Sequence, residues 1–255
     1  MLAHRRSRRY IFYNPARMGT LWRWNMNRIA KASCIILACS LAVCSSPVKK
    51  AVIDPSLPHL SVTLTFNADA YNSILLKKIY PTYAIWVRDP ASGETRTIYV
   101  TGKAGKNSWM FADERPSAAP VWSGTGGRAA DVDSVTSATP SGETFTHEWQ
   151  VPEALRGKKL EIFIEANIAF DYNEHFPKDA PKDSPAFSDV NGQPSLVWRA
   201  RIEDASKDAA VTPALIGHGH VLGKDHEIDA DLSRITTAKN IFGYVKLAYS
   251  AGGKK

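Results

Sequence analysis

Cysteine is scarce in this 255-residue chain: there are three, Cys34, Cys39 and Cys44, all within one short segment. The rest of the chain therefore has no disulfide framework, no cysteine-based zinc site and no thiol nucleophile. It also has no phosphate-binding loop of the GxxxxGK[ST] type and no GxSxG nucleophile elbow. No local signature thus marks the chain as an enzyme, and we expect a non-catalytic protein.

Acidic residues are absent from the first 44 residues, which carry eight basic ones, and the first carboxylate is Asp54. The whole chain has a formal net charge of +7, whereas residues 45–255 hold 24 basic and 25 acidic residues. A basic DNA-binding domain would carry its positive charge within the folded part of the chain. Because that part is close to neutral, we expect no nucleic-acid partner.

Long hydrophobic runs are also missing. The longest, residues 32–44, has about 13 residues, and a membrane-spanning helix needs about 20. It follows Arg28 and Lys31, and a basic stretch before a short apolar run is typical of a secretory signal peptide. We predict that residues 1–44 are a signal peptide, with Met18 and Met26 as alternative starts, and that the protein resides in the periplasm or cell envelope.

The end of this segment allows two kinds of processing. Residues Leu41–Cys44 resemble a lipobox, which would place a lipid on Cys44 and anchor the protein to a membrane. Ordinary cleavage after Ala42 or Cys44 would release a free protein instead. Residues 45–58 contain three prolines and are predicted to be a linker, and residues 251–255 form a short basic tail.

Residues 59–250 are predicted to form one domain, because they contain short strand patterns separated by turns. Residues 59–66 alternate apolar and polar side chains, as in a strand with one buried face. Few segments favour helices, and only 75–80 and 232–239 are expected to form short ones. We predict an all-β, antiparallel immunoglobulin-like β-sandwich with long loops, with a closed barrel as the alternative. The other expected strands are 82–89, 94–100, 144–149, 159–168, 196–202, 211–221 and 241–249.

Several of these segments follow one another in a familiar order. The succession Tyr83–Asp89, Asp133–Pro140, Trp149 and Ile162–Asn167 resembles a family of predicted periplasmic domains, sometimes labelled flagellin-biosynthesis or hook-cap-like proteins. The resemblance covers about residues 60–249. It implies an exported immunoglobulin-like β-sandwich without an established activity. We therefore expect a binding or accessory module whose partners are envelope proteins.

Residues Asp133–Thr139 are similar to the acceptor motif on which extracytoplasmic flavin transferases attach FMN to a threonine. This likeness implies FMN attachment at Thr139, with Asp133 as the acidic residue of the motif and Ser137 where a glycine is usual. A covalently flavinylated electron carrier is therefore the alternative function. The other interpretation is a structural turn, because Asp, Ser and Thr side chains readily bond to nearby backbone.

The only histidine cluster contains His218, His220 and His226. In a strand His218 and His220 would share a face, as zinc or copper ligands do, and Asp225 could add a third ligand. The neighbouring glycines favour a loop that would hold ligands poorly. We therefore expect surface histidines and no metal.

Glu161 and Glu165 lie an even number of residues apart in a predicted strand, so they share a face. Paired carboxylates can serve a glycosidase, which keeps an envelope hydrolase as a third candidate function. We expect instead a solvated strand face opposite buried Ile162 and Ile164.

Five tryptophans could line a sugar site but are expected to lie mostly in the core: Trp86, Trp109, Trp122, Trp149 and Trp198.

Overall fold

Strands dominate the computed structural model, which describes residues 52–67, 73–74, 77–106, 115, 118–126, 136–137 and 143–253. The first of two large sheets has the order β10-β12-β1-β7, and the second has the order β11-β9-β8-β4-β5-β6. Their pairings are antiparallel except for that of β5 with β6. The four-stranded sheet consists of β1 (His59–Phe66), β7 (Thr144–Gln150), β10 (Ala209–Val211) and β12 (Phe242–Ser250). The six-stranded sheet consists of β4 (Thr82–Arg88), β5 (Thr95–Thr101), β6 (Thr136–Ser137), β8 (Leu160–Asn167), β9 (Leu196–Ile202) and β11 (Ala214–His218).

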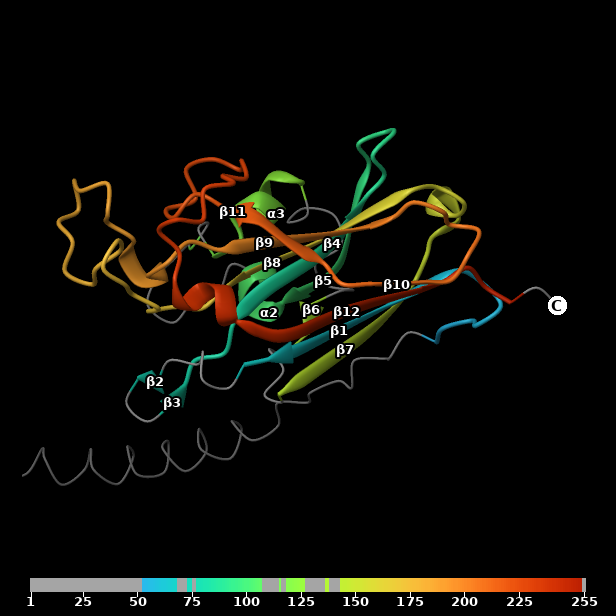
Figure 1. Ribbon diagram of the computed structural model, residues 1–255, viewed down its shortest axis with the longest axis horizontal. Helices are drawn as coiled ribbons and strands as arrows, with labels where there is room; N and C mark the ends of the chain where they lie inside the picture. Colours follow the sequence, from blue (N-terminus) through green and yellow to red (C-terminus); the bar gives the residue numbers. More distant parts are fainter. Residues whose placement is uncertain are drawn as a thin grey trace, which may run out of the picture. The chain divides into compact units, whose positions relative to one another are not determined.

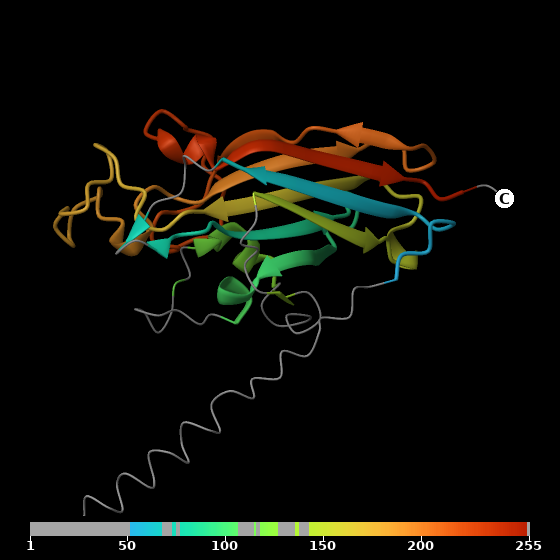
Figure 2. The same cartoon turned by 90° about the horizontal axis from the view of Figure 1, so that it is seen from below.

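The two sheets lie face to face around a shared apolar core (Figure 2). Strand β1 shows how the sequence produces this packing, because Leu60, Val62 and Leu64 are fully buried while the residues between them are partly exposed. From the opposite sheet, Ile162 and Ile164 of β8 enter the same core. The prediction of an all-β antiparallel sandwich is confirmed, and the alternative of a closed barrel is not.

A second apolar cluster lies on the outer face of the six-stranded sheet. Helices α2 (Gly102–Lys106) and α3 (Pro120–Gly124) contribute to it, and Figure 1 shows both beside this sheet. Trp122 of α3 is fully buried there, and the rings of Trp86 and Phe163 stack with centroids 5.2 Å apart. Part of this sheet is therefore covered on both faces, and every residue of β8 is buried.

Connections between the strands contain short 3-10 helices: η4 (Glu153–Leu155), η5 (Asp189–Asn191) and η6 (Thr237–Asn240). The helix expected at 232–239 is thus replaced by the single turn of η6. The prediction of a helix at 75–80 is wrong, because β2 (Ser73–Ile74) and β3 (Lys77–Lys78) pair as two short antiparallel strands. Six residues are too few for the hydrophobic period to distinguish a helix from a strand. Within the described ranges, no helix is long and apolar enough to cross a membrane.

Candidate binding site

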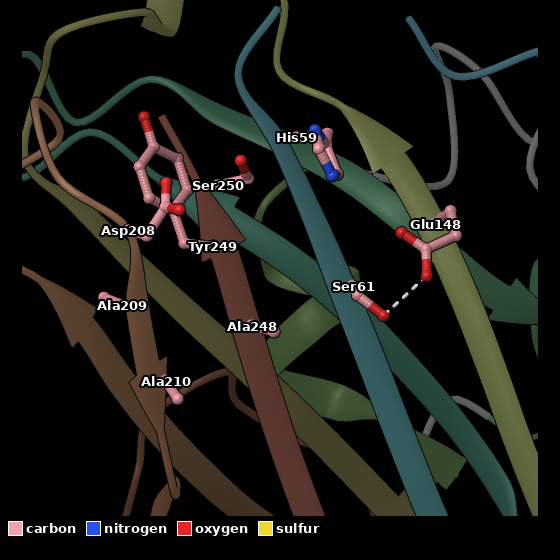
Figure 3. Close-up of a pocket in the computed structure, with 9 residues that line it drawn as sticks. All are labelled: His59, Ser61, Glu148, Asp208, Ala209, Ala210, Ala248, Tyr249 and Ser250. Carbon is pink, nitrogen blue, oxygen red and sulfur yellow. Dashed lines mark hydrogen bonds between the residues drawn. The ribbon is translucent and has the colours of Figure 1, made fainter. Parts of the chain in front are cut away.

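A groove of about 450 Å³ crosses the outer face of the four-stranded sheet (Figure 3). The register of the sheet places four side chains of the groove in one row across it. Ser61 of β1 lies between Glu148 of β7 and Ala248 of β12, and Ala248 in turn lies opposite Ala210 of β10. Three of these four side chains are small, so the floor of the groove is shallow and open. The volume falls within the usual range of small-ligand sites.

Glu148 stands at one side of the groove and accepts a hydrogen bond of 2.6 Å from the hydroxyl of Ser61 through Oε1. No hydrogen bond to Oε2 is present among the described residues, so this oxygen is free to accept from a ligand. His59, next along β1 on the same face, contacts the carbonyl of Leu57 through Nδ1 at 3.1 Å. Because a carbonyl only accepts, Nδ1 carries a proton and donates.

Asp208 stands at the other side of the groove, before β10, with β12 and β1 between it and Glu148 in Figure 3. Its Oδ1 accepts a hydrogen bond of 2.8 Å from the backbone N–H of Ala251. The lining contains these two carboxylates and neither lysine nor arginine. Its electrostatic potential therefore favours a cationic ligand group.

No family model, curated protein or solved structure matches the chain. The assignment of a function therefore depends on the chemistry of the described residues and on the sequence patterns. The resemblance to the periplasmic domain family stays a prediction.

The structure corrects the expectation for Glu161 and Glu165. Both face outward from β8, but they are only 4% and 0% exposed, so this strand face is not solvated. Glu161 is held by Arg88 and Arg201, which donate to its two oxygens. Burial raises the pKa of Glu161, but these arginine hydrogen bonds outweigh it and leave the pKa below its ordinary value.

Glu165 has a different environment, because it binds the first turn of α3. Its Oε2 accepts from the backbone N–H of Trp122 at 2.8 Å, and its Oε1 accepts from that of Val121 at 3.2 Å. The hydroxyl of Ser195 donates to Oε1 at 2.6 Å. Burial raises the pKa of Glu165 to about 7, although these hydrogen bonds act in the opposite direction. This carboxyl fixes α3 to the sheet.

These contacts do not form a hydrolytic site. Ser195 is fully buried beside Glu165, so its hydroxyl cannot be reached by a substrate. In the described part of the chain, no histidine forms a hydrogen bond with a serine hydroxyl. Glu161 and Glu165 flank Phe163 on one strand, and both are buried and held by other side chains or by backbone. The hydrolase candidate gains no support from this geometry.

Each histidine of the predicted cluster has a structural contact. His218 contacts the carbonyl of Gly219, His220 accepts from the N–H of Leu222, and His226 contacts the carbonyl of Pro120. No group of three or more potential ligands is arranged to hold a metal among the residues that the structure describes.

Two predicted cofactor residues, Asp133 and Thr139, lie outside the described residues, and so does Trp109. The centre of the motif is described: Thr136 and Ser137 form β6, which adds to the edge of the six-stranded sheet beside Val100 and Thr101.

The tryptophan prediction holds in the described part of the chain, with one refinement. Trp198 belongs to the core between the sheets and Trp149 packs against it, whereas Trp86 and Trp122 belong to the outer cluster.

Sequence reasoning missed the groove because its residues come from four strands that are distant in the sequence. The alternation of β1 does place His59 and Ser61 on the exposed face. The pairing that sets Ala248 and Glu148 beside Ser61 spans 187 and 87 residues, and no local pattern reveals it.

Proposed function

We propose that this protein is an exported, non-catalytic binding module of the bacterial cell envelope, and that the groove on its four-stranded sheet holds a basic group of an envelope protein. The observation that carries this proposal is the lining of the groove, which has a carboxylate at each side and a floor of small side chains. Export is supported by the predicted signal peptide, residues 1–44.

The shape of the groove suits a long, thin group. Ala210, Ala248 and Ser61 leave room above the sheet for an aliphatic chain, such as the stem of a lysine or arginine. Glu148 and Asp208 are placed to receive the charged end from either direction. A large neutral ligand such as a sugar ring would lack an exposed aromatic platform here, because the only aromatic side chain of the lining besides His59 is that of Tyr249, which is 2% exposed.

The experiment measures binding of a fluorescein-labelled tetralysine peptide by fluorescence anisotropy at low ionic strength, where surface electrostatics is least screened. We expect Glu148→Gln with Asp208→Asn to weaken binding at least tenfold, since two charge-assisted contacts are lost. Ala248→Leu, which fills the floor without changing charge, should weaken binding as well.

Glu203→Gln is the matched control, because Glu203 is an exposed carboxylate outside the groove, paired with Lys159 at 3.0 Å. It should leave the affinity for tetralysine unchanged. Equal losses for the Glu203 and groove variants, or no loss for the groove variants, would contradict the proposed site.

The second candidate, a covalent FMN carrier, has one structural observation in its favour. Residues Thr136–Ser137 lie in the edge strand β6, so the centre of the motif is at a sheet border. The intact mass of the protein isolated from its native envelope tests export, a lipid on Cys44 and FMN on Thr139 together. An unmodified mass combined with no flavin fluorescence in a denaturing gel would eliminate the carrier.

A further inference from the structure

Three arginines surround one buried carboxylate at the end of the six-stranded sheet. The register sets Arg88 of β4 and Arg201 of β9 on either side of Glu161 of β8, and Arg199 lies opposite the neighbouring Phe163. Arg88 donates to Oε2 of Glu161 through Nε at 2.9 Å and also through Nη2. Arg201 donates to Oε1 through Nε at 3.0 Å, and Nη1 of Arg199 is 3.7 Å from Oε1.

The side chains of this arginine cluster (Arg88, Arg199 and Arg201) are accessible, whereas the carboxylate is not. Their exposed fractions are 43%, 32% and 53%, against 5% for the side chain of Glu161. The cluster is also held in place, because the guanidinium of Arg88 lies 5.1 Å from the ring centroid of Phe163. Ligand-binding donors that are fixed before binding lose little conformational entropy when they bind.

The charge of the cluster is unbalanced. Three positive charges face one negative charge, which leaves a local excess of two. Glu161 receives only three hydrogen bonds, two from Arg88 and one from Arg201. Each guanidinium carries five N–H donors in a planar arrangement that fits oxyanions, so most donors of the cluster have no partner within it. The local excess matches a dianion, and a phosphate monoester is a dianion above its second pKa, near 6.

We infer that the arginine cluster binds a phosphate group, either free or in a soluble phosphoester, or at the surface of a membrane containing a terminal phosphate lipid. This site lies on a different sheet from the groove, so it does not depend on the proposed function. The Glu161 carboxylate orients the guanidiniums of Arg88 and Arg201, and the phosphate oxygens accept from the donors that face solvent.

The test follows the Arg Nε–Hε signals of the full-length protein by NMR during titration with inorganic phosphate at pH 8, against chloride at equal ionic strength. We expect the signals of Arg88, Arg199 and Arg201 to shift with phosphate and not with chloride. Arg199→Gln should lower the affinity for phosphate about tenfold, because one charge-assisted contact is lost. This position is chosen because Arg199 has the longest contact with Glu161, so its replacement disturbs the buried carboxylate least.

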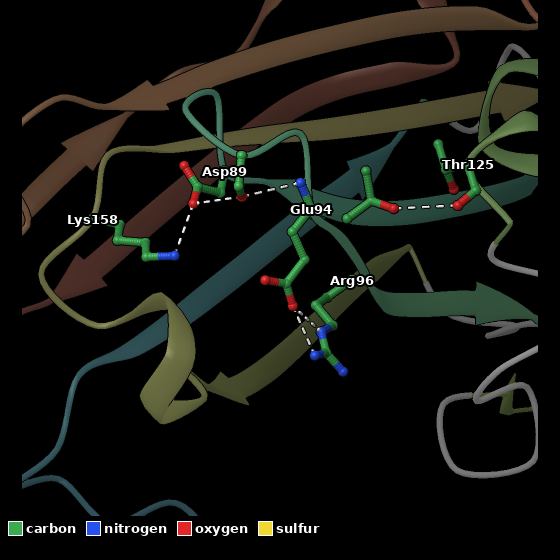
Figure 4. Close-up of polar contacts among 7 residues, drawn as sticks. Asp89, Glu94, Arg96, Thr125 and Lys158 are labelled. Atoms are coloured by element: carbon green, nitrogen blue, oxygen red, sulfur yellow. Dashed lines mark hydrogen bonds and ion pairs between the residues drawn. The ribbon is translucent and has the colours of Figure 1, made fainter.

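Arg96→Gln is the matched control. Arg96 lies on neighbouring β5 and is paired one to one with Glu94 through its Nε at 2.9 Å and its Nη2 at 2.7 Å (Figure 4). Its replacement should leave the phosphate affinity unchanged. Equal shifts with phosphate and chloride, or equal losses for the Arg96 and Arg199 variants, would overturn the inference.

Vesicles distinguish the two sources of phosphate. Flotation with phosphatidylcholine vesicles, prepared with and without about 20% phosphatidic acid, reports on the lipid source, because anionic lipids attract basic groups to the membrane surface. Binding to the phosphatidic acid vesicles that Arg199→Gln weakens supports a membrane phosphate, and an NMR response without vesicle binding supports a soluble one. Failure of both assays would overturn the inference, while the tetralysine assay would still report on the groove.

Discussion

Replacing Glu165 by glutamine tests whether a buried acid controls the pH dependence of stability. Glutamine keeps the size of the side chain and retains an oxygen that can accept from Trp122 or Ser195. It removes the ability to ionise. In the native protein the carboxyl is fully buried, and burial raises its pKa from 4.5 to about 7. The variant therefore isolates the free energy that this ionisation costs the folded state.

The sign and size of the effect follow from the two pKa values. Between pH 4.5 and about 7, the folded protein holds the proton that the unfolded chain has released. The free energy of unfolding therefore falls as pH rises through this window, and the contribution is fully present only below pH 4.5. A pKa difference of about 2.5 corresponds to about 3 kcal/mol of stability lost by pH 8.

The measurement is equilibrium urea unfolding at several pH values from 4.5 to 8.5, followed by tryptophan fluorescence. We expect the native protein to lose about 3 kcal/mol more than Glu165→Gln over this range, because other titrating groups affect both proteins equally. Glu203→Gln, which alters an exposed carboxylate, should follow the native pH profile. Parallel profiles for the native protein and Glu165→Gln would refute the reasoning.

Two further predictions concern Gly192 and Ser195, which come shortly before β9. The hydroxyl of Ser195 donates to Glu165 and lowers the pKa of this carboxyl. Ser195→Ala removes that hydroxyl and should raise the pKa of Glu165, so the loss of stability should extend to higher pH in the same unfolding assay. Gly192→Ala should cost about 2 kcal/mol or more, because φ is +68° and an added Cβ would lie 2.4 Å from the backbone of Asp171. Gly157→Ala, at φ +72° in open space, should cost about 1 kcal/mol, and equal losses for the two glycines would contradict the steric argument.

The sequence predicted the strands of the core well because their alternation is local. The pattern of residues 196–202 predicts a strand with the same bounds as β9 (Leu196–Ile202), and the buried residues of β1 follow the predicted period of two. Alternation says which residues share a face and nothing about what covers that face. The pattern of β8 therefore predicts a solvated face for Glu161 and Glu165, whereas α3 and the arginines cover that face.

The binding features could not be predicted for a related reason. Both the groove and the arginine cluster combine residues from strands that are distant in the sequence and that the sheet register brings side by side. A lone Ser61 or Arg199 carries no signal of its partners. Register depends on which strands become neighbours, and that is decided by packing of the whole sandwich rather than by any window of sequence.

The position of β12 has a consequence for when the protein can fold. This strand lies between β10 and β1, and it pairs His59 with Ser250, 191 residues apart. Until β12 has been synthesised, β10 has no neighbour and β1 has only β7, so the four-stranded sheet cannot form. Pairings of such long range also close slowly. The four-stranded sheet can therefore be completed only after the last strand, β12 (Phe242–Ser250), has left the ribosome.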